Sequence, residues 1–123
     1  QPEFSALCLD AMTDGTLDDA LRTGRTPLEW SPLGGGRLGT GMAADDDRTA
    51  AVHAVLDRVA ADHGTTRAAA ALAWVLAHPS RPVAIVGTQQ IDRLHELAAA
   101  TSVRLDRAEW YEVLVASRGE AMP

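Results

Sequence analysis

The sequence predicts an α/β fold with a parallel β-sheet, and two observations lead to it. Short apolar, β-branched runs alternate with segments whose apolar residues recur at helical spacing. Strands that alternate with helices form βαβ units. The glycines gather directly after one such run, where five of the eight residues from Gly34 to Gly41 are glycine. Loops that follow the strands of parallel sheets are where ligands bind.

Length and composition are those of one globular unit. Of 123 residues, 46% are hydrophobic and 23% charged, enough to bury a core. The net charge is −6 without lysine or a basic run, so we expect no nucleic-acid partner. No apolar run approaches the roughly 20 residues that span a bilayer, so we expect no membrane partner. The single cysteine, Cys8, fits a small buried side chain and a cytoplasmic location.

The segment up to Trp30 predicts a short helix followed by a strand. Thr16, with an acid three residues later, is a candidate N-cap. The helix then runs to about Thr23, where Gly24 stops it. The run from Pro27 to Trp30 is a strand candidate, and the extended opening of the chain is a possible further strand.

Two helices are predicted between the strands. Three acids at 45–47 precede an apolar stripe with i, i+3, i+4, i+7 spacing, and Gly64 ends it. The stripe consists of Val52, Val55, Leu56 and Val59. Negative charge at a helix N-terminus is stabilising, so the acids need no metal. Thr65 or Thr66 caps the next helix, which Pro79 closes. Its inward-facing residues are Leu72, Val75 and Leu76.

The last third predicts a strand and two helices. The run 82–86 is apolar throughout and bounded by Pro and Gly, as in a strand buried on both faces. A short helix follows over about 91–99. Asp106 with Glu109 then opens a final helix. Its apolar residues are Trp110, Val113 and Leu114.

The visible sheet is too small to stand alone. Two convincing strands and a possible third leave two exposed edges, whereas parallel sheets are covered on both faces. We therefore expect the chain to be the last part of a barrel or of a doubly wound domain, with its earlier strands missing.

Both strand ends carry residues suited to an anion. The first end reads SPLGGGR over 31–37, and glycines let an anion approach backbone N–H groups. The second reads GTQQ over 87–90 and leads into a helix whose N-terminus favours phosphate. A flexible loop is the alternative for each alone. Together they favour a phosphate site like that after strands 7 and 8 of many (β/α)₈ barrels.

These segments resemble the C-terminal part of an aldo-keto reductase, over essentially the whole chain. The similarity rests on MTDGTLDD, WSPLGGGRL, AAALAWVLAHPSRPVAIVGT and IDRLHEL. It implies that residues 1–123 form the C-terminal portion of a single (β/α)₈ TIM-barrel domain, from about strand 6 to the final helix. It also implies hydride transfer between NADPH and a small carbonyl substrate.

The resemblance assigns roles at the nicotinamide and pyrophosphate. Gln1 resembles the glutamine that bonds the nicotinamide carboxamide, and Trp30 the aromatic residue that stacks on the nicotinamide ring. Arg37 adds charge beside the pyrophosphate loop. That loop corresponds to Ser31, Leu33, Gly34, Gly35 and Gly36. A core position is the alternative for Trp30.

Further roles fall at the adenosine end. Gly87 and Thr88 resemble the segment that faces the adenosine 2′-phosphate. Arg93 resembles the arginine that pairs with this phosphate or stacks on adenine, and Glu96 the polar residue at the adenine amino group. A solvated helix face is the alternative for the last two.

The family's catalytic Tyr, Lys, Asp and His have no match here. Lysine is absent, and amphipathic packing on the last helix explains Tyr111. The four histidines lack the spacing of metal ligands, and solvated or capping roles are expected. We therefore expect the chain alone to be inactive, with catalysis supplied by a missing N-terminal part of the barrel. The alternatives are a non-catalytic nucleotide- or phosphate-binding module and a half-barrel that pairs with a second copy or another chain.

Overall fold

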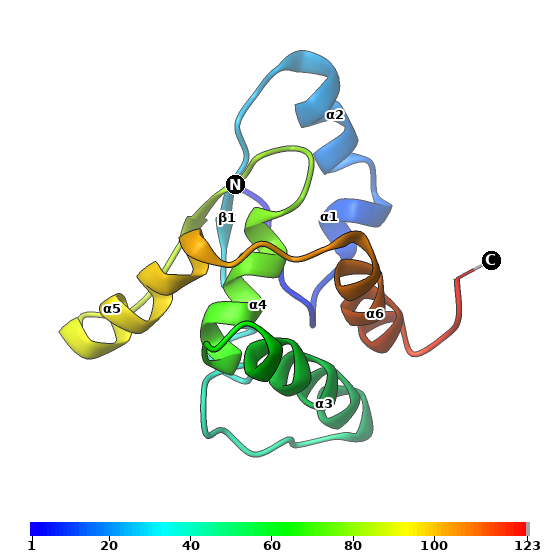
Figure 1. Cartoon of the computed structure of the whole chain (residues 1–123). Coiled ribbons are helices and arrows are strands. Elements are labelled where there is room, and N and C mark those ends of the chain that lie inside the picture. Colours follow the sequence, from blue (N-terminus) through cyan, green and yellow to red (C-terminus); the bar gives the residue numbers. More distant parts are fainter. Residues whose placement is uncertain (123) are drawn as a thin grey trace.

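The computed structural model describes residues 1–122 as two short parallel strands packed with six α-helices and one 3₁₀ helix (Figure 1). Figure 1 shows α3 and α6 side by side, with α5 at the opposite margin. In chain order the elements are α1 (Asp10–Thr13), α2 (Thr16–Thr23), β1 (Leu28–Trp30), α3 (Asp47–Asp62), α4 (Arg67–Leu76), β2 (Val83–Ile85), α5 (Ile91–Ala98), η1 (Ala99–Ser102) and α6 (Arg107–Arg118).

The two strands lie next to each other and run parallel. Leu28 is opposite Val83, and Trp30 is opposite Ile85. The opening of the chain adds a third parallel segment through a bridge between Glu3 and Trp30. The chain passes from β1 to β2 through α3 and α4, so the predicted βαβ connection is confirmed.

One face of this sheet is open, contrary to the prediction of a strand buried on both faces. Val83 and Ile85 are 52% and 43% exposed, and Trp30 is 46% exposed. Successive side chains of a strand point to opposite faces, so these residues share one side with Leu28. We call these four residues the open face. Nothing within residues 1–122 covers it, whereas Glu29, which points to the other side, is fully buried.

The core lies between the strands and the helices that follow them. All residues of α4 from Ala68 to Val75 are buried. Their side chains are mostly alanine, which lets this helix pack closely against β2 and α5. Trp74 and Phe4 are the largest fully buried side chains, and their ring centroids lie 5.2 Å apart. Trp110 stacks on the other side of Trp74 and brings α6 onto this core.

Side-chain caps fix the starts of α3, α4 and α6, as predicted for these three helices. The side chain of Asp46 accepts a hydrogen bond from the backbone N–H of Thr49, which caps α3. Thr66 caps α4 in the same way. At α6, Asp106 and Glu109 form a reciprocal capping box. The acids at 45–47 thus act at a helix terminus, as the charge pattern indicated.

The predicted N-cap of α2 was wrong. Gly15 occupies the N-cap position with φ +87°, and Thr16 is the first helical residue. The side chain of Asp14 accepts the hydrogen bond from the backbone N–H of Thr16 at 2.8 Å. Aspartate side chains accept a backbone N–H two residues later in such turns, so Asp14 binds the first N–H of the helix.

Two of the four histidines differ from the prediction of solvated or capping roles, whereas His95 is exposed and His63 is the C-cap of α3, as predicted. His53 and His78 are buried, and the His53 ring bonds the backbone carbonyl of Arg37 at 2.8 Å. His63 lies 2.9 Å from a carboxylate oxygen of Glu109. Among residues 1–122, no group of three His, Cys, Asp or Glu side chains is arranged to hold a metal ion. Within the same range, no helix is long and apolar enough to cross a membrane.

Candidate cofactor-binding site

The carboxyl ends of β1 and β2 meet at one edge of the sheet. Because Trp30 and Ile85 are paired in register, the loop 31–46 and the segment 86–90 start side by side. The second segment leads directly into α5. The structure therefore places both sequence-predicted loops at a common edge, where parallel α/β proteins bind ligands. Gln1 is exposed, and the parallel bridge between Glu3 and Trp30 places it toward the amino end of β1, two residues away from this edge.

The glycine-rich turn is closed by hydrogen bonds between its own residues. Ser31, Gly34, Gly35 and Gly36 all have positive φ, between +53° and +90°. The Ser31 hydroxyl accepts a hydrogen bond from the N–H of Gly35 at 2.8 Å, and its carbonyl accepts from the N–H of Gly34 at 2.9 Å. The N–H of Gly36 donates to Leu33 at 3.1 Å. The N–H groups that the sequence suggested for an anion are thus bonded within the turn.

Arg37 anchors this turn to the start of α3. Its guanidinium lies 2.7 Å from carboxylate oxygens of both Asp45 and Asp46, and 2.7 Å from the hydroxyl of Thr49. The hydrogen bond with Asp45 raises the pKa of Arg37 and lowers the pKa of Asp45. Two carboxylates therefore balance the charge that sequence reasoning assigned to the pyrophosphate.

Arg67 holds the far side of the same loop, a contact that sequence reasoning missed. Its side chain makes a two-pronged ion pair with Asp57 at 2.7 and 2.8 Å. It also donates to the carbonyls of Gly39 and Met42, at 3.3 and 2.8 Å. In the sequence, Arg67 is only an arginine that follows the predicted cap of a helix, and nothing in that pattern indicates its partners in the loop.

Thr40 joins the loop to α5. Its hydroxyl donates to the carboxylate of Glu96 and accepts a hydrogen bond from the N–H of Ala68 at 3.2 Å. The loop, α4 and α5 therefore meet at one hydroxyl. Glu96, which the resemblance assigned to adenine, already has a partner in the loop.

The start of α5 presents a free cation. Gly87 is exposed, and Thr88 accepts a hydrogen bond from the N–H of Gln90 at 3.2 Å. The helix begins at Ile91, so Arg93 lies in its first turn. Arg93 is exposed, and no hydrogen bond or ion pair joins its guanidinium to another residue in the range 1–122. A helix N-terminus and an unpaired guanidinium together suit a phosphate group.

Tyr111 lies far from these loops in the chain and has a packing role. It is on α6, where its ring meets Trp110 edge-on at 5.3 Å. The guanidinium of Arg107 lies over its outer face, 5.6 Å from the centroid. Both contacts agree with the amphipathic packing predicted for this residue.

Comparison with known proteins identifies the family to which these loops belong. The model of the aldo/keto reductase family matches residues 1–115. The chain is 49% identical over 123 residues to a 6-dehydroglucose reductase of Novosphingobium aromaticivorans, which covers 100% of this chain and 40% of that protein. It is 34% identical over 120 residues to a 6-dehydroglucose reductase of Agrobacterium fabrum, and the match covers 98% of this chain and 38% of that protein.

Solved structures agree in fold. A thermostable aldo-keto reductase, Tm1743, solved with the inhibitor epalrestat, has a TM-score of 0.78 at 25% identity, over 93% of this chain and 38% of that chain. An aldose reductase from Giardia lamblia has a TM-score of 0.69 at 19% identity, and the match covers 98% of this chain and 37% of that chain.

The α/β fold of the described residues is thus consistent with part of the TIM barrel of aldo-keto reductases. The chain belongs to the aldo/keto reductase family, and the resemblance noted in its sequence is confirmed. It spans about two-fifths of the length of the curated relatives that it matches.

Proposed function

We propose that residues 1–123 are the cofactor-binding, C-terminal part of an NADPH-dependent aldo-keto reductase, from about strand 6 of a single barrel domain to its final helix. The reaction is the reduction of a small carbonyl compound by hydride transfer. The names of the two bacterial relatives favour a sugar-derived carbonyl such as 6-dehydroglucose as the substrate. The observation that carries the proposal is the unpaired Arg93 in the first turn of α5, the helix that follows the segment 86–90 at the edge where two parallel strands end.

Each residue has a part in holding the nucleotide. NADPH, when bound, supplies the hydride. Trp30 offers an exposed aromatic face for the nicotinamide ring, and Gln1 an amide for its carboxamide. The turn 31–36 contacts the pyrophosphate through side chains and rearranged N–H groups, and Arg37 holds that turn in place.

At the adenosine end, Gly87, Thr88 and the α5 N-terminus receive the 2′-phosphate, and Arg93 pairs with it. Glu96 contacts adenine from its position beside Thr40. The proton for the developing alkoxide comes from a group outside residues 1–123, since Tyr111 is engaged on α6.

The decisive experiment is Arg93→Met in the complete reductase. A hydrogen bond to a charged group contributes about 1.5–3 kcal/mol, so NADPH affinity should fall by roughly one to two orders of magnitude. NADH lacks the 2′-phosphate, and its affinity should barely change. Added salt should weaken NADPH binding more than NADH binding in the parent, and this difference should vanish in the variant. Fluorescence titration measures all four affinities.

The matched control is Arg22→Met, which removes an exposed arginine from α2 and should leave both cofactors unaffected. Equal losses for NADPH and NADH in Arg93→Met would remove the 2′-phosphate role from this arginine. They would leave the family assignment intact, since that rests on the whole chain.

A second experiment addresses the isolated chain. Because the open face is apolar and uncovered, residues 1–123 alone should not sediment as a compact monomer. They should also show no carbonyl-dependent NADPH oxidation, and adding the N-terminal part should restore it. A cooperatively melting monomer that binds NADPH would favour an independent nucleotide-binding module, and a stable dimer would favour a self-associating half-barrel.

A further inference from the structure

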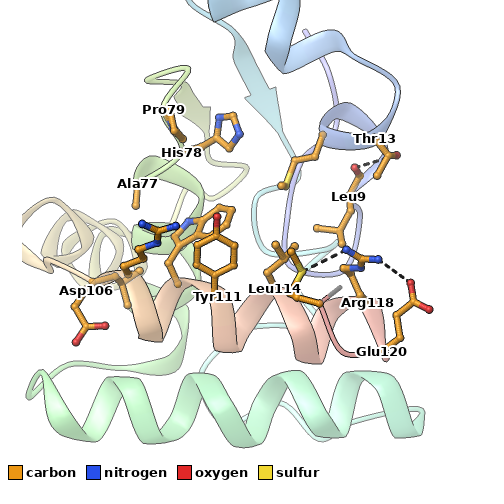
Figure 2. Close-up of a pocket in the computed structure, with 15 residues that line it drawn as sticks. Leu9, Thr13, Ala77, His78, Pro79, Asp106, Tyr111, Leu114, Arg118 and Glu120 are labelled. Atoms are coloured by element: carbon orange, nitrogen blue, oxygen red, sulfur yellow. Dashed lines mark hydrogen bonds and ion pairs between the residues drawn. The ribbon is translucent and has the colours of Figure 1, made fainter.

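A separate pocket lies in the helical layer, between α1 and α6 (Figure 2). Figure 2 shows Leu9 and Thr13 on one side of it, His78 on another, and Tyr111 and Leu114 on α6. Its volume of about 750 Å³ is that of a small-molecule site. It shares no residue with the twelve positions assigned to the cofactor. The proposed function therefore leaves this pocket unexplained.

The walls of the pocket are mostly apolar and one of them is rigid. Leu9, Met12, Leu105 and Leu114 line it together with Trp110. The Trp110 indole is stacked on a fully buried tryptophan and its N–H is hydrogen-bonded at 3.1 Å, so this ring cannot turn into the pocket. Such a surface accommodates a flat apolar molecule at little cost in side-chain ordering.

His78 places a buried hydrogen-bond donor in this wall. The residue is 8% exposed. Its Nδ1 accepts a hydrogen bond from the backbone N–H of Ser80 at 3.1 Å and lies 2.8 Å from the Ser80 hydroxyl. Because a backbone N–H only donates, Nδ1 carries no proton and Nε2 does. Burial lowers the pKa of His78, so the ring is neutral at pH 7. Within residues 1–122, no hydrogen bond engages Nε2.

The rim of the pocket carries two arginines and two carboxylates, and one of the arginines forms no ion pair. Arg118 is paired with Glu120 at 2.8 Å. The Asp106 carboxylate accepts the N–H of Glu109 as the cap of α6. Arg107 faces the ring of Tyr111, and no carboxylate in the range 1–122 forms an ion pair with it. A buried donor and a free guanidinium beside apolar walls complement an anion on a flat apolar body.

We propose that this pocket binds a small aromatic carboxylate. The ring lies among the leucines and against Trp110, the carboxylate accepts the Nε2–H of His78, and Arg107 attracts the charge at the rim. The site is distinct from the proposed cofactor edge, and its ligand takes no part in hydride transfer.

The test uses the complete reductase and 2-naphthoate, with binding measured by calorimetry in the presence of saturating NADPH. Removing the donor in His78→Phe should weaken binding about tenfold. Arg107→Gln should weaken it about threefold, because this charge is exposed to solvent. The neutral analogue 2-naphthamide should bind the parent more weakly than 2-naphthoate. Arg22→Gln, on an exposed face of α2, is the control and should change nothing.

A crystal soaked with 6-bromo-2-naphthoate locates the ligand. The bromine signal should lie between α1 and α6, and Leu114→Trp, which fills the pocket, should abolish it. Three outcomes would overturn the proposal. The bromine signal could lie only in the substrate cleft, or another part of the reductase could fill the pocket. The affinity for 2-naphthoate could also be unchanged in both His78→Phe and Arg107→Gln. If Leu114→Trp fails to fold, the affinity of Arg107→Gln for 2-naphthoate still tests the proposal, because Arg107 is exposed. Carbonyl turnover is measured on the same proteins. A reductase that turns over but does not bind 2-naphthoate in this pocket would contradict this proposal and leave the proposed function intact.

Discussion

Trp74 and Trp110 bind each other through two reciprocal hydrogen bonds. The indole N–H of Trp74 donates to the backbone carbonyl of Trp110 at 3.0 Å, and the indole N–H of Trp110 donates to the carbonyl of Trp74 at 3.1 Å. The rings are stacked, with centroids 5.1 Å apart and planes 15° apart. Because Trp74 lies in the last turn of α4, its carbonyl has no helical partner to displace. The pair therefore satisfies the end of one helix while fastening another to it.

We expect the two tryptophans to act as one unit in stability. Trp110→Phe removes one indole N–H and leaves a carbonyl unsatisfied, which should lower the free energy of unfolding by about 1–3 kcal/mol. Trp74→Phe should cost at least as much, because this side chain is fully buried. The double variant should lose less than the sum of the two. Urea unfolding of the complete reductase measures the three values, and strict additivity would mean that the stacked pair is not coupled.

Glu29 should make stability depend on pH. Its side chain is fully buried, and neither carboxylate oxygen has a hydrogen-bond partner among residues 1–122. Burial raises the pKa of Glu29 from its ordinary 4.5 to about 7. Between these values the folded chain binds more protons than the unfolded one, so stability falls as pH rises through this window. The full effect is about 3 kcal/mol at most.

Glu29→Gln, which does not titrate, isolates this effect. The variant should gain stability relative to the parent as pH rises from 4.5 to 7, and the difference should be constant above about pH 8. Groups common to both proteins cancel in the difference. Thermal unfolding of both proteins across this pH range measures the difference. A Glu29→Gln variant whose stability ran parallel to that of the parent would contradict the prediction.

Gly34 and Gly35 should differ in their tolerance of alanine. Both have positive φ, +58° and +67°, so alanine at either position costs about 1–2 kcal/mol from the backbone alone. A Cβ on Gly34 would lie 3.0 Å from Cδ1 of Leu7, whereas one on Gly35 meets open space. Gly34→Ala should therefore destabilise the protein more than Gly35→Ala, as measured by denaturant unfolding. Equal losses would show that Leu7 moves aside freely.

The contact between Thr40 and Glu96 should limit local opening of the loop. Thr40→Val and Glu96→Ala each remove one partner, and amide exchange over residues 38–46 should become about three- to tenfold faster. The double variant should be no faster than Thr40→Val alone, because this substitution also removes the acceptor of the Ala68 N–H. Thr101→Val, which removes a hydroxyl bonded only to the nearby Ala98 carbonyl, is the control. Additive acceleration would mean that the two side chains act on the loop separately.

Local features of the fold were predictable because they depend on residues close in sequence. The capping box of Asp106 and Glu109 involves positions three apart, and the apolar stripe of α3 repeats within one turn. Pro27 to Trp30 also gave a strand in the predicted place. The exception at Thr16 arose because Asp14 accepts the backbone N–H of Thr16 and the helix starts one residue earlier, with Gly15 as its N-cap.

The candidate site was predictable in its location but not in its contacts. The parallel arrangement of two strand ends follows from the order of strands and helices. The ion pairs of Arg37 and the bond between Thr40 and Glu96 depend on the path of the loop, which is set by consecutive residues with positive φ. Such a path joins residues 56 positions apart, and no local pattern indicates the partner.

The two arginines that flank the glycine loop have a consequence for how fast and how tightly ligands bind. Arg37 fixes the loop to α3, and Arg67 fixes its far side to α3 and α4. The backbone between them is therefore already ordered before any ligand arrives, and little conformational entropy is lost on association. A nucleotide bound here as we propose would enter through small adjustments of Gly34 to Gly36 and not by folding of the loop around it, so its dissociation would be governed by direct contacts.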